Sequence, residues 1–254
     1  MTGAIVAGLW GNIRAECEII SHLPPVRWVV LAGLICQLAI LSQTVHFWTP
    51  VLGYYFSQSM VAIAQLSWWS ILIISAYMGA GDAYWKTAGV RLTSTTRGVV
   101  VATRVITLVG CTMASVAVCA IVGWFLDLSA GTASLSLSTL AQFLSTWVII
   151  TFWSLLGLLV ASVAKSLWVT ITAIIGYYLV ERLILDVWLP AGVVRFLPAN
   201  NQYALLHLIE SETQGFIASP HPIASSPGSA AVYFTTAMIL ICVLLWLRAR
   251  QDNW

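Results

Sequence analysis

The chain has 254 residues, of which 60% are hydrophobic and only 8% are charged, and its mean hydropathy is +0.92. A soluble globular protein carries roughly 25% charged residues, so most of this surface cannot face water. The net charge of +2 is too small to predict nucleic-acid binding. Composition therefore predicts an all-α integral membrane protein, and the length fits a single transmembrane domain over residues 1–254.

The first 24 residues predict an amphipathic helix that lies on the membrane surface. Ile5, Leu9 and Ile13 fall on one helical face, with Arg14 and Glu18 opposite them. Pro24 and Pro25 then turn the chain into the bilayer.

Six transmembrane helices are predicted from the long uncharged runs, because a bilayer span needs about 20 apolar residues. Residues 28–81 contain no Asp, Glu, Lys or Arg, and Trp48-Thr49-Pro50 divides this stretch into two spans. Asp127 and the Ser-, Gly- and Thr-rich stretch 128–138 predict a short loop, and Lys165 marks a tight turn. The predicted spans are 27–47, 58–79, 105–126, 139–163, 167–189 and 230–247.

Residues 191–229 form the longest connection outside the spans on one side of the membrane. Four prolines punctuate it, and the residues from Tyr203 to Glu210 predict a short interfacial helix.

With six spans both termini share a side. Nine of the 11 Lys and Arg residues gather there: Arg14, Arg27, Lys86, Arg91, Arg97, Arg104, Lys165, Arg248 and Arg250. The positive-inside rule therefore predicts cytoplasmic termini and an external segment at 191–229.

The connection between the second and third spans, residues 82–97, is longer than a helical hairpin needs. It combines mixed charge with aromatic and small polar residues. Asp82 is expected to cap a short amphipathic helix over 83–93 that runs parallel to the membrane. The alternative is a basic loop that only fixes the topology.

Several residues of this connection resemble the cytoplasmic loop in permease subunits of type-2 ATP-binding-cassette exporters. The matches are Asp82 at the end of the second span, the run Gly89-Val90-Arg91-Leu92, then Arg97 and Arg104. The family usually has Glu at the Asp82 position and often a Pro before the Arg97 position. Leu197-Pro198-Ala199-Asn200-Asn201-Gln202-Tyr203 is similar to the start of the family's external helices.

The resemblance implies a permease that moves a substrate out of the cytoplasm. In the family a coupling helix, here 82–97, docks into a separate cytoplasmic ATPase, usually present in two copies, and a second permease copy or paralogue completes the pathway. Tyr84 and Trp85 would pack at that contact, and Lys86 and Arg91 would supply polar pairing. ATP and Mg²⁺ would bind in the partner, because the chain lacks Gly-Lys and so has no phosphate-binding G-x-x-x-x-G-K-S/T loop.

Uncharged polar residues inside the first two spans are candidates for a pathway or a dimer interface. Gln37 and Thr44 are seven residues apart and share a helical face, and so do Gln58 and Gln65. They would either line a path between two subunits or form hydrogen bonds between helices, worth about 0.6 kcal/mol each.

Glu181 and Arg182 interrupt the fifth predicted span. Glu181 follows the start of that span by 14 residues, about 21 Å along the helix at ~1.5 Å per residue. Arg182 and Asp186 have the spacing of an ion pair on one helix face. These residues are therefore expected to form either a salt bridge that anchors the end of the helix, the polar rim at the outer end of a substrate path, or a link across the permease dimer.

Other functions stay open. A secondary transporter or channel would need more charge within the spans or two similar halves, and a structural subunit of a membrane complex needs neither. We expect no enzymatic activity, because the sequence lacks a nucleophile elbow and an H-E-x-x-H motif. His207 and His221 are a poor metal signal, so no metal or cofactor is expected. The 13 tryptophans and the lack of organelle signals fit a bacterial plasma membrane.

Overall fold

The computed structural model describes the helical core of the protein. It covers residues 10–15, 17–18, 56, 59–60, 63–64, 68–85, 97–129, 131, 137–185, 188–213 and 226–251, with the backbone alone at 81–85, 97, 207–213 and 251. The predicted first span, 27–47, lies outside these residues. So do Gln37, Thr44, Gln58, Gln65 and most of the connection at 82–97.

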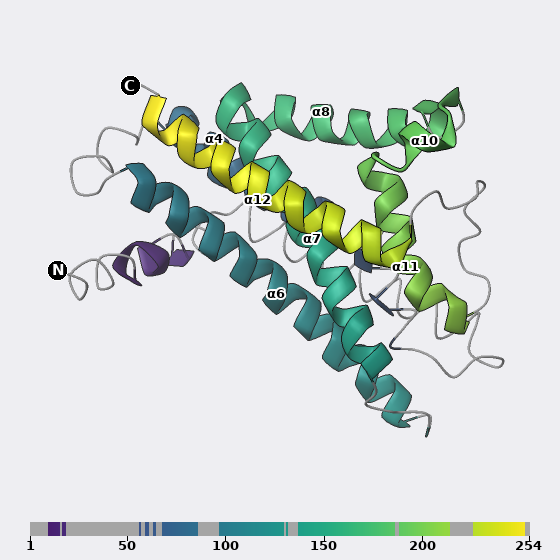
Figure 1. Cartoon of the computed structure of the whole chain (residues 1–254). Helices are drawn as coiled ribbons and strands as arrows, with labels where there is room; N and C mark the ends of the chain where they lie inside the picture. The colour runs from purple at the N-terminus through teal and green to yellow at the C-terminus, as the bar shows by residue number, and fades with distance from the viewer. Residues whose placement is uncertain are drawn as a thin grey trace.

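The described residues form helices and turns and contain no strand (Figure 1). The helices are α4 Trp68–Trp85, α6 Arg97–Ser129, α7 Leu137–Ala164, α8 Leu167–Val180, the π-helix η2 Glu181–Leu185, α10 Ala191–Val194, α11 Pro198–Thr213 and α12 Pro227–Gln251. Four helical stretches are long and apolar enough to cross a bilayer: Gly98–Ser129, Leu137–Ala164, Leu167–Leu185 and Pro227–Arg250. The chain is therefore an all-α, multi-pass membrane protein.

The observed helices cover four of the predicted spans. α6, α7 and α12 contain the segments 105–126, 139–163 and 230–247, while α8 and η2 cover the fifth predicted span as far as Leu185. The described part of the second predicted span is helical at 59–60, π-helical at 63–64 and continues into α4. The total of six spans stays a prediction.

The N-terminal region is helical where it is described, at 10–15 and 17–18. Arg14 and Glu18 form an exposed ion pair with an Nε–Oε1 distance of 3.1 Å. Since the two residues are one turn apart, the pair lies on the polar face that the sequence predicts.

Basic residues collect at one end of the bundle, which we call the basic end. α7 ends beside Lys165, and α12 carries Arg248 and Arg250 in its last turn. Figure 1 shows the last turns of α12 beside the start of α6, the helix in which Arg104 lies two turns from the beginning. Lys165 has a left-handed φ of 51°, which makes the predicted tight turn between α7 and α8.

Two local predictions are wrong. Asp82 lies inside α4, whose backbone continues through Trp85, so Asp82 does not precede a new helix starting at residue 83. Asp127 belongs to α6, which ends at Ser129, and is not part of the loop that follows. Both helices run further than the apolar stretch that predicted them. A membrane helix can extend past its last lipid-facing residue where other groups satisfy its end.

α4 and α7 pack closely because small residues line their contact. A Cβ added at Gly79 of α4 would lie 2.5 Å from the Ala161 Cβ and 2.8 Å from the Leu158 carbonyl oxygen, both in α7. One added at Gly157 of α7 would lie 2.6 Å from a Leu72 methyl group. Such spacing of small residues lets two helix backbones approach closely inside a bilayer, where dispersion contacts replace the hydrophobic effect.

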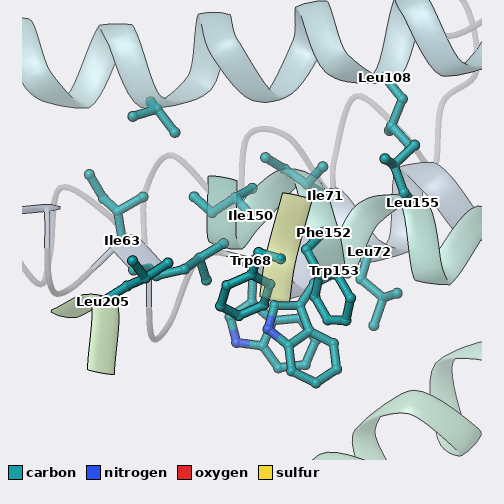
Figure 2. Packing of buried hydrophobic residues seen from close by; sticks show 14 of the residues in the cluster. Ile63, Trp68, Ile71, Leu72, Leu108, Ile150, Phe152, Trp153, Leu155 and Leu205 are labelled. Atoms are coloured by element: carbon teal, nitrogen blue, oxygen red, sulfur yellow. The ribbon is translucent and has the colours of Figure 1, made fainter. Parts of the chain in front are cut away.

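Aromatic rings fill the core beyond this contact. Trp68 of α4 stacks on Trp153 of α7 with ring centroids 4.9 Å apart, and both side chains are fully buried. Phe152 meets Phe234 of α12 edge to face at 4.9 Å. Figure 2 shows Trp68, Phe152 and Trp153 together, with Leu108 of α6 reaching toward Leu155 of α7. The core therefore joins α4, α6, α7 and α12.

Candidate functional site

Of the residues predicted to act in function, Glu181 and Arg182 are the two whose side chains the structure describes. Asp82, Tyr84 and Trp85 are described as backbone in the last turn of α4, and Arg97 as the first residue of α6. Lys86, Gly89 and Arg91 lie outside the described residues. The candidate site is therefore built around the point where η2 meets α11.

Glu181 is fully buried and binds the start of another helix. Its Oε1 accepts hydrogen bonds from the backbone N–H groups of Ala199 at 2.5 Å and Asn200 at 3.4 Å. The first N–H groups of a helix have no partner within that helix, and its N-terminus carries a partial positive charge. A carboxylate is well suited to this position, so Glu181 caps α11 from outside it.

The sequence of α11 explains why it can begin inside the protein. Pro198 is its first residue and has no N–H to satisfy. Asn201 Nδ2 donates to the carbonyl oxygens of Arg195 at 2.8 Å and Leu197 at 2.9 Å, and Asn200 Nδ2 donates to that of Val194 at 3.4 Å. Glu181 thus accepts from the N–H groups while the asparagines donate to the carbonyls. The backbone N–H groups at the start of α11 and the carbonyl groups just before it thus both have partners in an apolar environment.

Gln202 extends this polar network into the middle of the bundle. It accepts a hydrogen bond from Trp153 Nε1 at 2.9 Å and donates from its Nε2 to the carbonyl oxygen of Ala64 at 3.1 Å. Trp153 lies 11 residues before Ala164, about 16 Å from the end of α7 at ~1.5 Å per residue. That is roughly half of a ~30 Å hydrocarbon layer. The bridge therefore joins three segments near the bilayer centre.

Arg182 contacts the same helix through an aromatic ring. Its guanidinium carbon lies 3.7 Å from the centroid of the Tyr203 ring, and the Tyr203 hydroxyl group shares a hydrogen bond with Tyr178 of α8. A cation over an aromatic face contributes more when both groups are desolvated. Glu181 and Arg182, at the start of a π-helical turn, both reach α11. Such turns often occur at functional sites.

We call this group the α11 anchor: Glu181, Arg182, Trp153 and their partners in α11, Ala199 to Tyr203. Every residue from Pro198 to Leu206 is buried. The predicted helix from Tyr203 to Glu210 is confirmed as part of α11, but α11 begins five residues earlier, at Pro198. Its interfacial position stays a prediction. The predicted salt bridge that anchors the end of the fifth span stays a prediction, whereas Glu181 binds backbone N–H groups at the start of α11. Asp186, the other predicted partner of Arg182, lies outside the described residues.

A second buried carboxylate, Asp127, plays a similar part at the end of α6. It accepts a hydrogen bond from the backbone N–H of Phe56 at 3.0 Å. One turn earlier in α6, a Cβ added to Gly123 would lie 3.1 Å from the Phe56 Cα, so this glycine permits the close approach. Sequence reasoning missed this site. The available signal was an acidic residue directly after an uncharged run, ahead of a polar loop.

No protein-family model matches the chain, and a search of curated proteins finds no significant match. Within the part of the chain that the structure describes, no group of three His, Cys, Asp or Glu side chains could hold a metal ion. The geometry supports a mechanical role for the α11 anchor, because polar contacts join the end of α8 to the start of α11 inside an apolar bundle. Displacing either helix would expose buried charge or backbone N–H groups.

Proposed function

We propose that this protein is the transmembrane permease subunit of an ATP-binding-cassette exporter. It moves a drug-like, lipidic or peptide antibiotic molecule out of the cytoplasm, and a separate ATPase subunit hydrolyses the ATP. The observation that carries the proposal is the basic segment 82–97, which joins the end of α4 to the start of α6. The pattern Asp82, Gly89-Val90-Arg91-Leu92 and Arg97 resembles a coupling helix.

The bundle needs an outside source of energy. Its sequence contains no nucleotide-binding loop, so ATP and Mg²⁺ belong to the partner. The basic end, with Lys165, Arg248 and Arg250, is the cytoplasmic side under the positive-inside rule. The end of α4 and the start of α6 meet the ATPase on that side of a plasma membrane, and both termini are cytoplasmic. A second permease copy or paralogue and a second ATPase complete the assembly.

The α11 anchor gives this exporter a means of closing its outer end. Because Glu181 holds the first turn of α11 and Arg182 holds Tyr203, α8 and α11 move together when the subunit rocks. Gln202 ties the same unit to Trp153 of α7. The outer side can then open in two ways: the whole α8–α11 unit moves, or the hydrogen bonds of Gln202 break. The Gln202 contact is weaker than the Glu181 contact because neither of its partners is charged.

Reconstitution with the ATPase encoded beside this chain tests the proposal. The two proteins should co-purify, and the chain should raise vanadate-sensitive ATP hydrolysis. The double variant Gly89→Ala/Arg91→Ala should lose that stimulation and export while the protein stays membrane-inserted. Gly192→Ala/Arg195→Ala is the matched control, since Gly192 has open space around it and Arg195 is exposed at the opposite end of the bundle. Unchanged export in the first variant would contradict the coupling role.

One observation favours a second candidate, an ion-coupled secondary transporter. Glu181 and Asp127 are carboxylates buried in the bundle, and such groups often mark ion or proton pathways. Both, however, accept backbone N–H groups, which gives each a structural task. Proteoliposomes separate the two candidates: transport that needs ATP and the partner supports the exporter, and transport driven by an ion gradient without ATP supports the alternative.

A further inference from the structure

A groove runs along one face of α12 and is independent of the α11 anchor. Its volume is about 430 Å³, and the described residues that line it are Thr235, Met238, Ile239, Cys242, Val243 and Trp246. Their spacing of three and four places them on one helical face. The Thr235 hydroxyl group donates to the Ala231 carbonyl oxygen at 2.8 Å, so its hydrogen is already used within the helix. The lining of the groove is therefore apolar over the residues that the structure describes.

The length of the groove matches one leaflet of a bilayer. Thr235 and Trp246 are 11 residues apart, which is about 16 Å along the axis at ~1.5 Å per residue. Half of a ~30 Å hydrocarbon layer is roughly 15 Å. A complete transmembrane helix would need a groove about twice as long, whereas an acyl chain of one leaflet fits this length.

The groove has a cation at one end. Trp246 closes it toward the basic end, and the Arg250 guanidinium carbon lies 3.7 Å from the centroid of the Trp246 ring. Arg250 is exposed and one turn further along, which places it about 6 Å beyond the groove, at headgroup depth if Trp246 marks the interface. The ring engages the face of the cation, so N–H groups at the edge of the guanidinium can reach a phosphate.

We propose that this groove binds an anionic phospholipid from the leaflet at the basic end. One acyl chain lies against Met238, Cys242 and Val243, and the lipid phosphate and anionic headgroup lie at Arg250. A single cation beside an anionic lipid is worth about 1 kcal/mol, or about a fivefold change in affinity. The site goes beyond the proposed export function and does not depend on it.

Native mass spectrometry of the full chain in detergent tests the site, with phosphatidylglycerol and phosphatidylcholine of identical acyl chains as probes. The wild type should bind phosphatidylglycerol about fivefold more tightly. Arg250→Gln should remove this preference and Arg250→Lys should keep most of it. Val243→Trp should weaken both lipids by filling the groove.

Two matched controls decide whether the effect is local. Leu244→Trp changes an exposed residue of α12 that does not line the groove, and Arg195→Gln removes a cation that also lies over a ring, that of Phe196 at 4.9 Å. Both should bind as the wild type does. Equal binding of the two lipids by the wild type, a retained preference in Arg250→Gln, or equal losses in Val243→Trp and Leu244→Trp would each overturn the proposal.

Discussion

Replacing Glu181 by alanine removes the acceptor for two buried backbone N–H groups at the start of α11. Each buried polar group left without a partner costs about 1–3 kcal/mol. Because the N–H groups of Ala199 and Asn200 would both lose their acceptor, we expect the free energy of unfolding to fall by roughly 2–6 kcal/mol. Glu181→Gln keeps an oxygen acceptor but loses the charge at the helix N-terminus, worth about 0.3–2 kcal/mol. The expected order of stability is wild type, then Gln, then Ala.

Thermal unfolding in detergent, followed by the circular dichroism of the helices, measures this order. A loss of 1 kcal/mol lowers the Tm of a chain of this size by about 2–4 °C, so Glu181→Ala should lower it by at least about 4 °C. Leu183→Ala is the control, because Leu183 lies in the same π-helical turn and is 70% exposed. A Tm for Glu181→Ala as high as that of Leu183→Ala would refute the capping role. Equal Tm values for the Ala and Gln variants would refute the role of the acceptor oxygen.

Three further experiments test the packing and the polar contacts, all by the same unfolding assay. Gly79→Ala should destabilise by about 1–3 kcal/mol through its clash with α7, whereas Gly176→Ala, which meets open space, should not; equal effects would contradict the close packing. Asp127→Ala should cost about 1–3 kcal/mol by leaving the Phe56 N–H without its acceptor, and a neutral result would remove that contact from the account. A double-mutant cycle of Trp153→Phe and Gln202→Leu should give a coupling energy of about 0.6–1.7 kcal/mol, and strict additivity would contradict their hydrogen bond.

The spans could be predicted from sequence because lipid imposes one strong rule, a long run of uncharged apolar residues. α6, α7 and α12 follow that rule, and Lys165 marks a real turn because it is the charged break between two apolar runs. The bounds were less predictable. Asp127 ends an uncharged run in the sequence, yet its helix continues to Ser129.

The polar anchor could not be read from sequence, because its partners are far apart along the chain. Glu181 binds residues 18 and 19 positions later, and Asp127 binds the N–H of a residue 71 positions earlier. Local spacing instead suggested Arg182 and Asp186 as partners. The run from Leu197 to Tyr203 is a recognisable motif in the sequence, but its buried position depends on Trp153 and Ala64 in other segments.

Photo-crosslinking from Trp85 in living cells tests the central proposal most directly. A benzophenone amino acid at this position, the last residue of α4, should capture a cytoplasmic protein in which mass spectrometry finds the G-x-x-x-x-G-K-S/T nucleotide-binding motif. The same amino acid at Ser226, just before α12 at the opposite end, should not. Labelling of a cysteine at position 85 by a membrane-impermeant reagent from outside the cell, or no ATPase adduct from that position, would contradict the exporter account.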